Sequence, residues 1–145
     1  MDPDILDAIT ERLAQYPVVN FTRKSDAELE IYPRDERGFP IYIQLDQREN
    51  TLHFGSFHWH YDNTEEETTD LLDHLMLGLT GLARVKEFAR HGKAYKWVLE
   101  VQDQTGTWHP DGTMCTFSFN FWIKPQVRYL RNDLLPASLV YSSVQ

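Results

Sequence analysis

Short runs of alternating apolar residues, separated by polar turns, are the feature that most limits the fold of this chain. Leu29 and Ile31 form the first run, and residues 41–45 form the second, with apolar side chains at the odd positions. Alternation with a period of two places apolar side chains on one face of a β-strand. The turn over residues 34–38 is short, so we expect the two strands to be antiparallel neighbours.

A third strand is predicted over residues 51–61, and its alternation breaks in the middle. Apolar residues occupy even positions up to Phe54 and odd positions from Phe57 onward, and Gly55 lies at the break. A β-bulge near Gly55 and Ser56 would bring these side chains to one face, because a bulge adds one residue to a strand. The three strands would then form a meander, after a polar stretch over residues 23–26.

Two helices are predicted from apolar residues spaced three and four apart. The first begins at Asp2-Pro3, runs to about Tyr16 and is closed by Pro17. The second begins at the capping box formed by residues 64–67, in which a Thr and a Glu can each satisfy a free amide of the first turn. Its apolar stripe extends from Leu71 to Ala89, and His91-Gly92 supplies a left-handed stop.

Two further strands are predicted near the end of the chain. Residues 95–101 and 115–123 alternate between apolar and polar side chains, and the turn signals of residues 105–112 predict a long exposed connection between them. Cys115 shares its parity with Phe117, Phe119 and Phe121, so we expect it to be buried. Pro125 ends the strand, and residues 127–129 are expected to begin a weaker third one.

These elements predict an α+β fold with the order α-βββ-α-ββ(β). We expect a two-layer sandwich, in which one antiparallel sheet of five or six strands is covered by the long second helix. At 145 residues the chain has the usual size of a single domain, 1–145. Residues 136–145 carry no clear pattern, and we assign them to a tail that can be flexible.

Charge and cysteine content limit the partners. The net charge of −8 disfavours nucleic acid, since binding to phosphates is built chiefly from Lys and Arg. The same charge would attract a basic protein surface. The single cysteine excludes an intramolecular disulfide, the first residues are acidic where a secretory signal is basic, and no apolar run approaches the span of a membrane. We therefore expect a cytoplasmic protein with a protein partner; a homodimer also fits.

The segment richest in chemical groups is the strand that contains His53, His58 and His60, followed by Asp62. With a bulge at Gly55 all four side chains would share one face, which would suit zinc or another divalent transition metal. The competing interpretation, which we favour, is that the rings of residues 57, 59 and 61 define the buried face. The histidines would then lie on the solvated face without a metal or other cofactor.

Two other groups are candidate binding residues. Asp62, Glu65, Glu66 and Asp70 belong to an acidic run at the start of the second helix, where carboxylates are favoured by the helix dipole and could also receive a basic partner. Trp108 and His109 lie in the predicted exposed connection. Neither group matches a catalytic signature, and no catalytic residue is nominated.

The sequence therefore favours a non-enzymatic protein-interaction module. The order of elements, the acidity and the length together resemble the layout of small secretion chaperones and of some acidic toxin-inhibitor proteins, which implies a chaperone-like or inhibitor-like role. The alternative is a metal- or small-molecule-binding protein, with hydrolytic activity as one outcome, that uses the face of His53, His58, His60 and Asp62.

Overall fold

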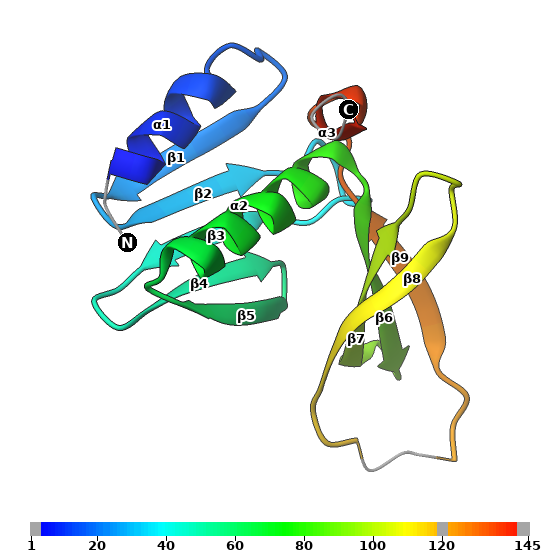
Figure 1. Ribbon diagram of the computed structural model, residues 1–145. Coiled ribbons are helices and arrows are strands. Elements are labelled where there is room, and N and C mark those ends of the chain that lie inside the picture. Colours follow the sequence, from blue (N-terminus) through cyan, green and yellow to red (C-terminus); the bar gives the residue numbers. More distant parts are fainter. Residues whose placement is uncertain (1–3, 119–121, 142–145) are drawn as a thin grey trace.

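Figure 1 presents the computed structural model of the chain, which describes residues 4–118 and 122–141. Helices and strands are mixed, the sheets are antiparallel, and the long helix packs on the first sheet. The α+β class is thus confirmed. The prediction of one sheet with five or six strands is wrong, because the strands divide into a sheet of five and a sheet of four.

The first sheet is a meander in which each strand pairs with the next along the chain. Its strands are β1 (Asn20–Ser25), β2 (Glu28–Tyr32), β3 (Ile41–Leu45), β4 (Glu49–Phe54) and β5 (Phe57–Asp62). Leu29 pairs with Ile43, and both are fully buried, as the alternation predicts. Strand β1 was not predicted, because Phe21 is the only large apolar residue in an otherwise polar segment.

The break in alternation at Gly55 is a hairpin turn rather than a bulge. Phe54 and Phe57 are paired across β4 and β5, so Gly55 and Ser56 form the two-residue connection, and Gly55 has a φ of 60°. A bulge and a two-residue turn both change the parity once and both use a glycine with positive φ. The turn also reverses the chain, which splits the predicted third strand into β4 and β5.

The helices α1 (Asp4–Leu13) and α2 (Glu65–Thr80) both contribute to the core of the first sheet. Helix α1 ends three residues earlier than predicted, and its buried residues Leu6 and Leu13 lie seven apart on one face. Helix α2 buries Leu71, Leu75 and Leu79. Within the described part of the chain, no helix has the length and apolar character that spanning a membrane requires.

The start of α2 is the predicted capping box with one change. The Thr64 hydroxyl accepts a hydrogen bond from the Glu67 amide at 3.1 Å. The Glu67 carboxylate reaches further back than in the usual box and accepts from the Asp62 amide at 2.6 Å. The cap therefore ties the helix to the last residue of β5.

The end of α2 lies well before the predicted stop. The helix ends at Thr80, and Gly81 adopts the left-handed conformation with a φ of 78°. Residues after it form strand β6 (Ala83–Arg90), in which Ala83, Val85 and Glu87 are buried in alternation. His91-Gly92 is a two-residue hairpin turn, with φ values of 53° and 75°, instead of a helix stop.

The second sheet has the order β8-β7-β6-β9, with β7 (Lys93–Gln102), β8 (Trp108–Cys115) and β9 (Gln126–Arg131). The predicted connection over residues 105–112 is wrong in its second half, since Trp108 begins β8. The turn signal of Pro110-Asp111-Gly112 reflects an irregularity: Pro110 pairs with Glu100 and Gly112 with Leu99, which leaves Asp111 as an extra residue. Proline is tolerated there because β8 is an edge strand.

Cys115 is exposed, which contradicts the predicted burial. It is the last residue of β8 and pairs with Lys96 on the polar face of the sheet. The expected strand over 115–123 does not continue from it, and Phe117 is 78% exposed. Phe119 and Phe121 lie outside the described residues. Alternation grouped Cys115 with the phenylalanines that follow it, but β8 ends at Cys115, and its neighbour Met114 is the residue that packs on the core.

One core cluster joins the two sheets. It contains Ile31 and Leu52 of the first sheet together with Val85, Trp97 and Leu99 of the second. Figure 1 shows α2 lying across the first sheet and leading directly into β6. The last element of the described residues is α3 (Ser138–Tyr141), inside the segment assigned to a tail.

We expect Gly78→Ala to lower the free energy of unfolding by about 1–3 kcal/mol, because the added methyl group would overlap the ring of Phe54, whose Cε1 lies 2.8 Å from the Cβ position. Urea unfolding followed by circular dichroism measures the change. Asp73→Ala, at an exposed position of the same helix, should stay within about 0.5 kcal/mol. A stabilised Gly78→Ala variant would contradict the close packing of α2 on β4.

Candidate functional site

The structure brings the three predicted histidines together on the β4–β5 hairpin. His53 and His58 are cross-strand partners with ring centroids 5.0 Å apart, and the centroids of His58 and His60 are 5.5 Å apart. They lie on the face opposite the buried Phe57 and Tyr61. Asp62 follows on the same strand and pairs with Glu49.

The ring orientations do not direct these histidines at one ion. The rings of His53 and His58 are stacked, with planes 28° apart, and the nitrogen lone pairs of an imidazole lie in the ring plane. The Nδ1 atom of His60 lies 3.1 Å from the Thr51 hydroxyl and 3.3 Å from a Glu49 carboxylate oxygen. Among the described residues, no three His, Cys, Asp or Glu side chains could hold a metal ion.

The acidic candidates at the start of α2 are exposed. Asp62, Glu65, Glu66 and Asp70 surround the first turn, where the helix dipole favours negative charge. The carboxylate of the neighbouring Glu67 is held by the Asp62 amide. The arrangement is that of a capped helix start, and the described side chains add no cation to it.

Trp108 and His109 separate onto opposite faces of β8. The Nε2 atom of His109 lies 2.6 Å from a carboxylate oxygen of Asp103, which belongs to the β7–β8 turn. Hydrogen bonds from Thr105 and then His109 hold the pKa of Asp103 well below its usual range. The ring of Trp108 lies on the other face, where it meets arginine side chains from β6 and β9.

These contacts are part of a larger arrangement, which we call the cation–aromatic ladder. It occupies the outer face of the second sheet, opposite the buried Val85, Trp97 and Leu99. Four cations alternate with three aromatic rings. In order across the sheet, its members are Arg131, Trp108, Arg84, Tyr129, Lys86, Phe88 and Lys96.

The centre of the ladder is the guanidinium of Arg84, which lies between two rings. Its Cζ atom is 4.0 Å from the centroid of Trp108 and 4.2 Å from that of Tyr129. Its Nε atom donates to Glu100 at 2.8 Å. Stacking uses the faces of the guanidinium and leaves the remaining N–H groups directed outward in its plane.

The other cations of the ladder have no ion-pair partner among the described residues. Within the described ranges, no carboxylate lies within 4 Å of Lys86, Lys96 or Arg131. Each lies near an aromatic ring, at 5.0–5.7 Å from a centroid. The ladder therefore presents positive charge that its own sheet does not neutralise, although the chain as a whole carries −8.

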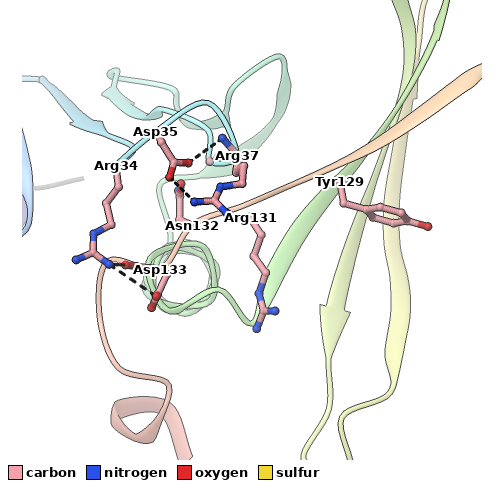
Figure 2. A pocket seen from close by; sticks show the side chains of 8 residues that line it. Arg34, Asp35, Arg37, Tyr129, Arg131, Asn132 and Asp133 are labelled. Carbon is pink, nitrogen blue, oxygen red and sulfur yellow. Dashed lines mark hydrogen bonds and ion pairs between the residues drawn. The ribbon is translucent and has the colours of Figure 1, made fainter.

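A pocket of about 420 Å³ continues this surface beyond Arg131 (Figure 2). Arg34 and Arg37 come from the loop between β2 and β3, and Tyr129 and Arg131 come from β9. Its two carboxylates are already paired: Asp35 with Arg37 at 3.1 Å and Asp133 with Arg34 at 3.8 Å. Arg131, which also belongs to the ladder, is the one arginine of the pocket without an ion-pair partner among the described residues.

Comparison of the chain with family models, with curated proteins and with solved structures finds no match.

Sequence reasoning nominated only Trp108 from the ladder, and it placed that residue in a loop. Arg84, Lys86 and Phe88 were assigned to the helix, where they would not share a face with Trp108. The signal that could have found them is the combination of Gly81 and the alternation that follows it, with Ala83, Val85 and Glu87 on one side. A glycine stop followed by period-two alternation indicates a helix end and a strand.

The histidine row, which consists of His53, His58 and His60, allows a prediction about protonation. Burial lowers the pKa of His53, and the nearby His58 and His60 lower it further. Protonation of His53 is therefore less favourable in the folded chain than in the unfolded chain. The free energy of unfolding should fall as the pH drops below the ordinary histidine pKa. We expect His58→Asn to raise the pKa of His53 in an NMR titration from about pH 4 to pH 8.

His109→Asn is the matched control for that titration, since His109 pairs with Asp103 in the other sheet and should leave His53 unchanged. An identical His53 pKa in the wild type and in His58→Asn would mean that the like charge of His58 has no influence on it.

Proposed function

We propose that this chain is a non-enzymatic protein-interaction module and that its cation–aromatic ladder binds an acidic segment of a partner protein. The observation that carries the proposal is the row of four cations on one sheet face of an acidic chain, with Glu100 as the single carboxylate bonded to it among the described residues. Cations that aromatic rings hold in a row can form ion pairs with the carboxylates of a partner.

The rings favour an acidic polypeptide over a single-stranded nucleic acid. Proteins that bind single strands offer open aromatic faces on which bases stack. Here Trp108 lies against Arg84 and Arg131, and Tyr129 lies against Arg84 and Lys86. The rings therefore orient the cations, and the net charge of −8 opposes a polyphosphate chain.

The expected affinity from charge alone is small. Exposed ion pairs contribute roughly 0.2–1 kcal/mol each, so four give at most about 4 kcal/mol, which corresponds to a Kd of about 1 mM. A useful complex needs further interactions beside the ladder. Such interactions must come from the partner's backbone or from apolar contacts.

The acidic start of α2, with Asp62, Glu65, Glu66 and Asp70, stays a separate prediction of a basic partner. Those carboxylates are accessible. The ladder is preferred because its cations and rings come from all four strands of one sheet, whereas the acidic run is accounted for by the helix dipole.

We expect the double variant Lys86→Glu/Lys96→Glu to weaken binding of a fluorescein-labelled poly-Glu peptide by at least about tenfold, because it reverses half of the ladder's charge. Fluorescence anisotropy at low ionic strength measures the affinity, which should fall as salt is added. A poly-Lys peptide of equal length tests for non-specific attraction.

The matched control is Arg12→Glu/Arg48→Glu, which changes the net charge equally at exposed positions away from the second sheet. It should retain the wild-type affinity for poly-Glu within about twofold. Equal losses in the two double variants would mean that overall charge, and not the ladder, governs binding.

A further inference from the structure

Strand β9 is an open edge of the second sheet. The strand order β8-β7-β6-β9 leaves β9 paired on one side only, with β6. Its residues from Gln126 to Tyr129 are exposed. An edge of this kind presents unpaired backbone groups to any extended chain that approaches it.

Two hydrogen bonds fix which backbone groups of β9 face outward. The Arg131 amide donates to the carbonyl of Arg37 at 2.7 Å, so it points away from β6. On the other side of β6, the Gln102 amide donates to the Leu82 carbonyl at 2.8 Å, so the even-numbered backbone groups of β6 face β7 and the odd-numbered ones face β9. Their partners on β9 are the even-numbered residues, which leaves the odd-numbered amides of β9 facing outward. Amides two residues apart on a strand point the same way, so those of Val127 and Tyr129 also face outward.

The outward amides lie beside a basic segment. Residues 124–131 contain Lys124, Arg128 and Arg131 and no acidic residue, and of these cations Arg128 is already paired with Glu87 of β6 at 2.6 Å. The ring of Tyr129 on the same strand lies against Arg84 and Lys86 of the ladder. The loop with Arg34 and Arg37 flanks the end of the strand (Figure 2).

We propose that the acidic segment binds in an extended conformation and adds to the second sheet as a fifth strand beside β9. This inference rests on the proposed function and specifies how the same surface is used. Backbone hydrogen bonds to Val127 and Tyr129 supply the attraction that exposed ion pairs lack, and the cations select acidic side chains. A peptide added to an edge strand is recognised in this way without a deep pocket.

The charge of the edge argues against a second copy of β9 as the occupant. Two such strands would bring together Lys124 and Arg131 of both chains, and like charges on neighbouring strands are destabilising. Basic side chains on an edge strand are a known protection against self-pairing. An acidic strand removes that repulsion.

The test uses the full chain and a labelled peptide of about ten residues in which Asp or Glu alternates with Val. Val127→Pro removes one outward amide and leaves the bonds to β6 in place, and proline is accepted on edge strands. We expect it to weaken peptide binding by at least about tenfold, while Val127→Ala, which keeps the amide, stays within about threefold of the wild type. Urea unfolding verifies that both variants fold.

A pair of modified peptides gives the same answer should Val127→Pro fail to fold. One peptide carries N-methyl groups on every acidic residue and the other on every valine, so that each lacks the amides of one edge. Strand addition predicts that one of them loses binding by at least about tenfold and that the other retains it. Equal affinity for the two would overturn strand addition.

The outcomes separate this inference from the proposed function. Loss of binding in Lys86→Glu/Lys96→Glu but not in Val127→Pro overturns strand addition and leaves the ladder as the binding surface. Binding unchanged in both overturns both. Tighter binding of a single-stranded oligonucleotide than of the acidic peptide, or a dimer that Val127→Pro abolishes in sedimentation, replaces the acidic segment with another occupant.

Discussion

The side-chain amide of Asn132 makes the two hydrogen bonds on which the arrangement of the sheets depends. Its oxygen accepts from the Phe39 amide at 3.0 Å, and its nitrogen donates to the Phe39 carbonyl at 2.9 Å. Asn132 is buried, so without these bonds Phe39 would bury unpaired backbone groups at a cost of about 1–3 kcal/mol each. The loop that enters β3 is thereby fixed to the residue that follows β9.

This junction also fixes the end of the ladder. Gly81 has no room for a side chain, because a Cβ atom there would overlap the Asn132 carbonyl oxygen. The Gly81 carbonyl accepts from Nε of Arg131 at 2.6 Å, and the Arg131 amide donates to Arg37. Helix α2, strand β9 and the pocket lined by Arg34 and Arg37 therefore meet at one place, and the Arg131 guanidinium is held between the Gly81 carbonyl and the Trp108 ring before any ligand arrives. An oriented guanidinium loses less freedom on binding than a free one.

The parts of the fold that the sequence predicted are those set by neighbours along the chain. The capping residue Thr64 and the alternation of Ile41, Ile43 and Leu45 needed no tertiary information. The errors arose where one local signal has two structural meanings. Gly55 fits a bulge or a turn, and His91-Gly92 fits a helix stop or a hairpin.

The candidate site was largely beyond sequence reasoning for a related reason. The cross-sheet contacts of Arg84 with Trp108 and Tyr129 join residues of three strands, and two of those strands, β6 and β9, pair across an intervening stretch of more than thirty residues. The histidine row and the acidic run at the start of α2 were predicted as groups, because the members of each are close together in the sequence. Residues that are close together in the sequence can be grouped by sequence reasoning. Residues that meet across four strands can be grouped only once the strand order is known.

Opposite charges gather on different parts of the molecule, and this restricts where an acidic segment can bind. The carboxylates of Asp62, Glu65 and Glu66 cluster at the start of α2 on the first sheet, while the ladder lies on the second sheet and the pocket lined by Arg34, Arg37 and Arg131 lies where the two sheets meet. An acidic segment is repelled by most of a chain with a net charge of −8 and attracted by one face of it. Repulsion elsewhere raises specificity as effectively as attraction at the site, since a misplaced partner meets like charge. The excess of acid in this chain is therefore compatible with an acidic ligand, and it restricts where that ligand can bind.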